Sequence, residues 1–128
     1  MSSIPENLAY TQEHEWVDLT DGVATVGVTA YAAEQLGDVV YVQLPEVGAT
    51  ATEGESFGEI ESTKSVSELF APVAGEVVEV NEAVVDAPEH VNNDPYGDGW
   101  LVRIRLAGDA PELLSATDYT KLTTEGDA

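Results

Sequence analysis

Residues 59–67 read Glu59-Ile60-Glu61-Ser62-Thr63-Lys64-Ser65-Val66-Ser67 and place a lysine between two runs of β-forming residues. The run before the lysine follows Gly54, and the run after it leads to Gly75. Strand-like runs bounded by glycine and turn-forming residues are typical of a β-hairpin. We therefore expect Lys64 at a hairpin tip, where a side chain projects into solvent and is accessible to other proteins.

The chain carries 25 Asp and Glu residues against 4 Lys and Arg residues, which gives a formal net charge of −21. So few cations argue against nucleic-acid binding, which needs many phosphate contacts. Self-repulsion at this charge disfavours the compact state unless salt screens it, which indicates a halophilic protein; an acidic interaction surface is the alternative. Against this acidic background, Lys64 is either a surface lysine that is present by chance or a lysine whose amine takes part in chemistry.

The length of 128 residues suits one domain with a hydrophobic core, and the hydrophobic fraction is 43%. Cysteine is absent, which excludes disulfides, thiol catalysis and cysteine metal sites. No secretory signal and no apolar stretch of membrane-spanning length is visible, so we expect a cytoplasmic protein that neither enters nor binds a membrane.

Most of the chain reads as short β-strands separated by glycine and proline. Strand-like runs cover Val23–Val28, Val39–Leu44, Ser56–Ser62, Val66–Ala71, Glu76–Asn81 and Trp100–Leu106. Thr29 is placed to cap a short helix that ends at Gly37, and further helical turns are expected at about residues 110–122. The prolines, glycines and Asx residues of 87–99 predict a loop. The fold class is therefore mainly β with short flanking helices.

The sequence builds no independent catalytic site. His14 and His90 are far apart and have no partner at helical spacing, so we expect no metal site, and a hydrogen-bonded structural role for His14. A serine–histidine pairing and a phosphate-binding loop are both missing. We therefore expect a protein that is acted upon, rather than an enzyme.

Several blocks, in order, resemble the glycine cleavage system H proteins, which are lipoyl-bearing carriers. The blocks are residues 10–17, 26–48, 61–77 and 91–101, so the resemblance covers nearly the whole chain. It implies a single carrier domain over residues 1–128 with the lipoyl-domain-like β-sandwich that is called a barrel-sandwich hybrid. In this reading the lipoyl hairpin spans about residues 54–80.

The resemblance also implies that Lys64 carries lipoate in amide linkage. Its partners would be a glycine decarboxylase that transfers an aminomethyl group to the lipoyl disulfide, an aminomethyltransferase, a dihydrolipoyl dehydrogenase and a lipoate-attaching enzyme. The loaded arm carries an amine, and by resemblance Glu15 is the first candidate for a cleft carboxylate that holds it, with Glu68 the second. We expect a monomer that docks transiently.

Other carriers and one binding module compete with this interpretation. A biotin carrier is disfavoured because Thr63 and Ser65, not methionines, flank Lys64. A lipoyl domain of a 2-oxoacid dehydrogenase is the nearer rival, although it would not need residues 10–17, 95–99 or the C-terminal helices. A paralogue that passes lipoate to other proteins and an unmodified acidic interaction module of similar fold also stay open.

Overall fold

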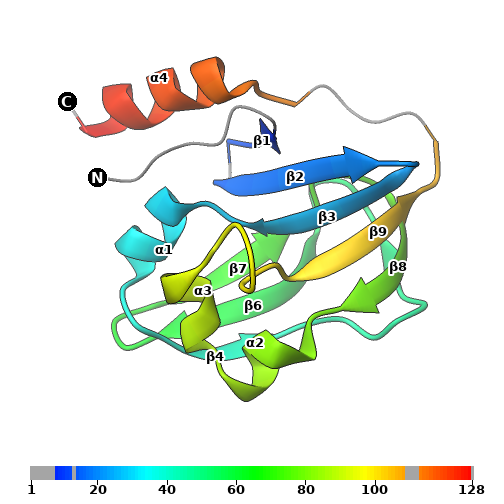
Figure 1. Cartoon of the computed structure of the whole chain (residues 1–128), viewed down its shortest axis with the longest axis horizontal. Coiled ribbons are helices and arrows are strands. Elements are labelled where there is room, and N and C mark those ends of the chain that lie inside the picture. The colour runs from blue at the N-terminus through cyan, green and yellow to red at the C-terminus, as the bar shows by residue number, and fades with distance from the viewer. Residues whose placement is uncertain (1–7, 13, 109–112, 128) are drawn as a thin grey trace.

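The computed structural model describes residues 8–12, 14–108 and 113–127, and two antiparallel sheets form its body (Figure 1). The larger sheet has the strand order β1-β2-β3-β9-β8-β5 and the smaller one β4-β6-β7. The strands are β1 Ala9–Tyr10, β2 Glu15–Thr20, β3 Val23–Val28, β4 Val39–Gln43, β5 Thr50–Ala51, β6 Ser56–Ser62, β7 Val66–Phe70, β8 Gly75–Val80 and β9 Val102–Leu106. The predicted mainly β sandwich is confirmed.

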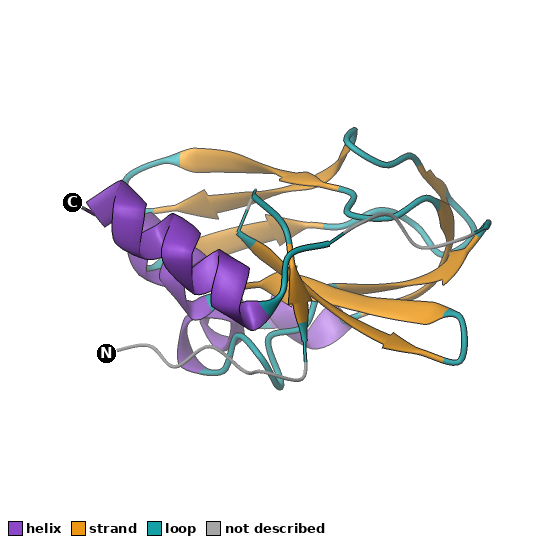
Figure 2. Cartoon of the chain, turned by 90° about the horizontal axis from the view of Figure 1, so that it is seen from above, coloured by secondary structure: helices purple, strands orange, loops and turns teal. Residues whose placement is uncertain are grey.

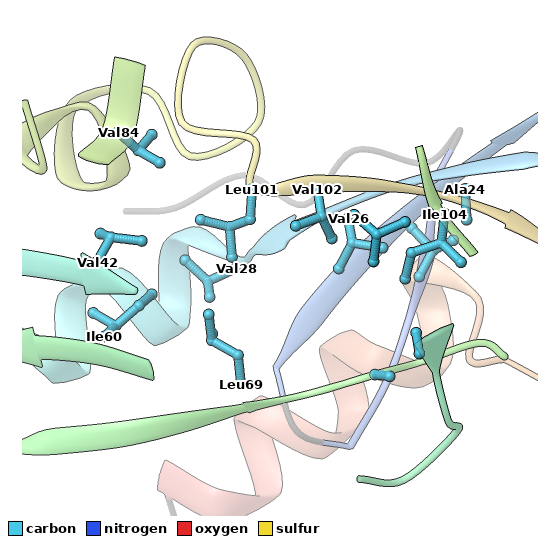
Figure 3. Close-up of a cluster of buried hydrophobic side chains, with 14 of the residues drawn as sticks. Ala24, Val26, Val28, Val42, Ile60, Leu69, Val84, Leu101, Val102 and Ile104 are labelled. Atoms are coloured by element: carbon cyan, nitrogen blue, oxygen red, sulfur yellow. The ribbon is translucent and has the colours of Figure 1, made fainter. Parts of the chain in front are cut away.

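The hydrophobic core lies between the two sheets (Figure 3). Val26, Val102 and Ile104 enter it from the larger sheet, while Val42, Ile60 and Leu69 enter it from the smaller one. Every second residue of a strand faces the core, which is why Ile60 is buried while its neighbours Glu59 and Glu61 are only half-buried. Full burial of one such aliphatic side chain contributes about 1.5–3 kcal/mol.

The hairpin that holds Lys64 is shorter than the sequence predicted. It consists of β6 and β7 alone and ends at Phe70, whereas β8 pairs with β5 and β9 of the larger sheet. Gly75 is the first residue of β8. A Cβ at this position would overlap the carbonyl oxygen of Arg105 on β9, so the position requires glycine. The glycine therefore marks a close approach of two strands in the other sheet, and the hairpin boundary predicted near residue 80 was wrong.

The first helix, α1 (Ala30–Leu36), follows the sequence prediction. The Thr29 hydroxyl accepts a hydrogen bond from the Ala32 N–H at 3.1 Å, and so caps the helix. Gly37 ends the helix with a φ of 80° and a ψ of −155°. Glycine adopts this positive φ readily, but the ψ lies outside the left-handed helical region.

Two further helices, α2 (Glu82–Asp86) and α3 (Glu89–Asn93), pack against β4 and against each other, and α3 also contacts α1. The second of them falls within residues 87–99, for which the sequence predicted a loop, and that prediction was wrong. Val84 and Val91 are fully buried and anchor α2 and α3 to the core. Asn81 caps α2, and its amide donates to the carbonyls of Asp98 and Trp100. Tertiary contacts thus stabilise helices that are too short to form alone.

The C-terminal helix α4 spans Ala116–Asp127. Of the helix predicted for about residues 110–122, the first part, up to residue 112, lies outside the described residues. Leu114 forms an antiparallel bridge with Tyr10, so the helix begins later than expected and reaches further. The Tyr119 ring of α4 stacks on Tyr10 with 4.8 Å between the ring centroids. This contact fastens α4 to β1 in a second core cluster, beside Trp16 and Ala116.

The helices gather toward one end of the sandwich (Figure 2). The turn between β6 and β7 lies at the same end, below α1 (Figure 1). Within the described part of the chain, no helix has the length and the apolar character that crossing a bilayer requires.

Candidate functional site

Lys64 lies in the tight turn that joins β6 to β7, as the sequence predicted. Ser62 shapes this turn: its N–H donates to the Ser65 carbonyl at 2.8 Å, and its hydroxyl accepts from the N–H groups of Lys64 at 3.3 Å and Ser65 at 3.1 Å. The Thr63 N–H donates to the Asp38 carbonyl at 3.0 Å. Backbone groups and the Ser62 hydroxyl therefore hold the turn, and the exposed Lys64 side chain takes no part in these hydrogen bonds.

A cleft of about 400 Å³ lies between α1 and β7, beside this turn. Tyr31, Ala32, Gln35 and Leu36 line it from α1, and residues 65–69 line it from β7 and the turn. Val28, Ile60, Leu36 and Leu69 give it an apolar floor. The residues that line it include no lysine and no arginine. The cleft therefore suits an alkyl chain that ends in a group able to bind a carboxylate.

Glu15 supplies that carboxylate. The side chain is only 2% exposed although it lines the cleft, and its Oε2 accepts a hydrogen bond from the Phe70 N–H at 3.0 Å. Glu15 also lines a second cavity of about 250 Å³. A buried carboxylate is costly unless hydrogen bonds or a cation compensate it, so this position favours a cationic ligand group in the cleft.

Glu68 occupies a different position from Glu15. It lies on β7, an edge strand of the smaller sheet, and its side chain is exposed. Glu68 pairs with Glu59, on the face opposite the buried Leu69. It lines the cleft only at this edge. The structure thus brings both candidate carboxylates to one cleft, Glu15 in its wall and Glu68 at its rim.

His14 lines the same cleft and is hydrogen-bonded, in agreement with the structural role that the sequence predicted. Its Nδ1 lies 2.8 Å from the Tyr119 hydroxyl, which is also 2.7 Å from the Thr29 hydroxyl. Burial raises the pKa of Tyr119 to about 12, so the phenol keeps its proton at neutral pH. This network links the C-terminal helix to the cleft wall and to the cap of α1.

Sequence reasoning missed the α1 side of the cleft. The helix itself was expected, and its helical spacing could have shown that Tyr31 and Gln35 share a face. No local signal, however, indicated that this face would meet the edge of β7. Within the described residues no group of three or more histidine, aspartate or glutamate side chains is arranged to hold a metal ion.

The sequence profile of the glycine cleavage H-protein family matches residues 8–126. A glycine cleavage system H protein of Thermobifida fusca is 61% identical over 121 residues, which cover 94% of this chain and 96% of that protein. A second, from Beutenbergia cavernae, is 62% identical over 122 residues, which cover 95% of this chain and 98% of the relative.

The crystal structure of a glycine cleavage system H protein from Mycobacterium marinum superposes with a TM-score of 0.90 at 49% identity. The superposition covers 94% of this chain and 99% of that one. Matches of this extent do not favour the 2-oxoacid dehydrogenase alternative. They also do not support the halophilic origin that the charge suggested, and salt dependence stays a prediction.

Proposed function

The chain belongs to the glycine cleavage H-protein family, and on that basis we propose that Lys64 is the residue that bears its lipoyl group. Members of this family are lipoylated carriers of the glycine cleavage system, and the chain is such a carrier subunit. The observation that carries the assignment is the position of Lys64: an exposed amine at a tight turn beside a cleft that can receive an alkyl arm.

The other lysine offers no such site. Lys121 lies on α4 and lines none of the described cavities. Lys64 is exposed at the turn, so an attaching enzyme can bind the hairpin from outside. When bound, lipoate supplies a disulfide that accepts the aminomethyl group of decarboxylated glycine and leaves a dithiol after unloading.

The chain contributes to this chemistry by binding the aminomethyl group, the cargo of the arm, and by shielding it from water. The apolar floor of the cleft packs against the hydrocarbon part of the arm, and the Glu15 carboxylate binds the amine of the aminomethyl group as an ion pair. Glu68 at the rim is the secondary carboxylate in this proposal, and solvent screens it more strongly. The burial of Glu15 keeps water away from the ion pair and strengthens it.

Membership of the system implies partner enzymes, and the specific set is part of the proposal. It consists of a glycine decarboxylase, an aminomethyltransferase, a dihydrolipoyl dehydrogenase and a lipoate-attaching enzyme. The chain acts as a monomer that docks transiently on each. The tether raises the local concentration of the cargo once a partner is docked. A paralogue that passes lipoate to other proteins is the second candidate function.

Intact-mass analysis tests the proposal. The chain is produced in a host that attaches lipoate, as wild type, as Lys64→Arg and as Lys121→Arg. Wild type and Lys121→Arg are expected to gain one lipoyl increment, and Lys64→Arg none. A chain that gains no increment, or gains it only through Lys121, would contradict the assignment. Glycine decarboxylation with the free lipoylated chain then separates the carrier from the lipoate-relay paralogue.

A further inference from the structure

An open groove of about 580 Å³ is lined by β4, the loop that follows it and α2, which packs beside β4 (Figure 1). We call it the β4 groove, and it shares no lining residue with the cleft beside Lys64. Tyr41, Val47 and Val85 line it, and each of these side chains is between 43% and 60% exposed. Three of the six large hydrophobic side chains that the described residues expose therefore gather in one groove, a concentration that marks an interaction site.

A β-bulge places Tyr41 at the surface. The pairing of β4 with β6 shifts between Val39 and Tyr41, which leaves Val40 as an extra residue on β4. Strict alternation from the buried Val39 would bury Tyr41, but the bulge moves the next buried position to Val42. Bulges commonly redirect side chains at functional positions, and this one moves an aromatic ring from the core to the groove.

The β4 groove adjoins the turn that carries Lys64. Tyr41 pairs with Glu61, which directly precedes this turn, and Glu61 pairs on its other side with the exposed Val66 of β7. Paired residues face the same side of a sheet, so Tyr41, Glu61 and Val66 form one row across the outer face of the smaller sheet. A protein that receives the arm of Lys64 must approach this turn, and the row leads from there to the groove.

Acidic side chains border the β4 groove. Glu46 and Glu82 are exposed and line it, and its lining residues include no lysine and no arginine. The ion pairs within the described part of the chain lie on the larger sheet, at Arg103 and Arg105, and involve neither glutamate. The groove therefore suits a protein surface on which lysine or arginine flanks an apolar side chain. A second copy of the chain does not fit this description, because two chains of net charge −21 repel each other.

We propose that the β4 groove is a docking surface for an enzyme that loads, unloads or reoxidises the arm. Tyr41 is its anchor, because aromatic side chains at the centre of an interface often contribute much of the binding energy. The glutamates at its rim attract the basic surface of the partner and orient it. The inference rests on the proposed carrier function for the identity of the partner, whereas the groove and its acidic rim are features of the unmodified chain.

Binding of the unmodified chain to purified partner enzymes tests the proposal without lipoate. The probes are the glycine decarboxylase, the aminomethyltransferase and the dihydrolipoyl dehydrogenase of the same organism. Tyr41→Ser and Val85→Ser are each expected to raise Kd about tenfold for at least one of these enzymes, the loss expected for an interface anchor. Leu19→Ser is the matched control, because Leu19 is 42% exposed on β2 and does not line the groove. Its Kd should equal that of the wild type.

The acidic rim is tested by the double variant Glu46→Gln with Glu82→Gln. We expect it to raise Kd about fivefold at low salt and to have little effect at molar salt, where the charges are screened. Glu53→Gln with Glu89→Gln is the control, because it removes two exposed acidic charges that do not line the groove. An equal effect of both double variants would mean that net charge, and not the rim, attracts the partner.

Three results would overturn the inference. The first is a Kd of Tyr41→Ser and Val85→Ser equal to that of Leu19→Ser with all three enzymes, and the second is a wild-type chain that binds none of them. The third is a dimer of the chain in sedimentation that Tyr41→Ser abolishes, because the groove would then bind a second copy. Missing lipoylation appears instead in the intact mass, so a failure of the docking surface and a failure of the carrier assignment give different results.

Discussion

The imidazole of His14 and the hydroxyl of Tyr119 are hydrogen-bonded at 2.8 Å although 105 residues separate them in the chain. His14 lines the cleft beside Glu15, and Tyr119 lies on the C-terminal helix. The same hydroxyl bonds the Thr29 side chain, which caps α1 on the other wall of the cleft. The C-terminal helix therefore supports the cleft without lining it.

Replacement of Tyr119 by phenylalanine tests this support. The variant removes one hydroxyl and its hydrogen bonds to His14 and Thr29, and we expect it to lower the free energy of unfolding by about 1–3 kcal/mol. Tyr41→Phe is the matched control, because Tyr41 is 46% exposed and loses the same atom. Urea unfolding in molar salt measures both. Equal stability of the two variants would contradict a supporting role of the hydroxyl.

Alkaline pH should weaken the fold through its buried tyrosines. Burial raises the pKa of Tyr119 from its ordinary value of 10.0 to about 12, and burial raises the pKa of Tyr10 further. Since the folded pKa of Tyr119 lies above the unfolded one, its contribution is present in full below pH 10 and is lost as pH rises to about 12. The urea midpoint should fall over this range.

Tyr119→Phe serves as the control for that pH dependence, because it removes one of the ionising groups. Its midpoint should fall less steeply above pH 10 than that of the wild type. Absorbance of the phenolate at high pH gives an independent reading: the variant should lose a late-titrating tyrosine. If the variant instead loses a tyrosine that titrates near the ordinary pKa of 10.0, burial does not raise the pKa of Tyr119.

Local patterns predicted the parts of the fold that local sequence determines. The cap at Thr29, the strand that ends at Leu106 and the turn at Lys64 each depend on a few adjacent residues, and the structure has all three. Helix α3 was missed because its sequence is typical of a loop, and tertiary contacts hold it: the burial of Val91 and the hydrogen bonds of the Asn92 side chain. The pairing of His14 with Tyr119 has no local signal at all.

The residues of the candidate site also divide into those that local sequence predicts and those that it does not. Lys64 could be predicted at a hairpin tip because turn and strand residues surround it. The burial of Glu15 could not, because it depends on the approach of the β7 edge and the Phe70 N–H, 55 residues further along the chain. The exposure of Glu68 follows from strand alternation, once the register with Glu59 is known.

Glu15→Gln should expose the cargo without unfolding the chain. The amide oxygen can still accept the Phe70 N–H, but the negative charge is gone. With the aminomethyl group loaded, hydrolysis by one water gives formaldehyde, ammonia and the free thiol. We expect this release to accelerate roughly 10- to 100-fold, the loss expected for a hydrogen bond to a charged group. A formaldehyde assay follows it.

Glu68→Gln provides the comparison, because it removes the same charge from an exposed position at the rim of the cleft. Its effect should be small, since solvent screens exposed ion pairs. If Glu15→Gln protects the cargo as well as the wild type does, Glu15 has no role in binding the amine. If Glu68→Gln has the larger effect, the roles of the two carboxylates are reversed.

Stability should depend strongly on salt. Against 25 acidic residues the chain has 4 Lys and Arg residues, and two of these cations already face acidic partners: Arg103 lies 2.6 Å from Glu79, and Arg105 lies 3.7 Å from Glu76. Salt shortens the screening distance from about 10 Å at 0.1 M to about 3 Å at 1 M. The melting temperature should therefore rise between low and molar salt, and an unchanged value would contradict the self-repulsion argument.

Asn92→Ala should loosen the segment of residues 37–39, which joins α1 to β4. The variant removes the donor to the Gly37 carbonyl and the acceptor of the Val39 N–H together, and we expect it to destabilise the fold by about 1–3 kcal/mol. Asn93→Ala, at the exposed neighbouring position, is the control. Urea unfolding measures both variants, and equal stability of the two would contradict a role of the Asn92 side chain in holding α3 against β4.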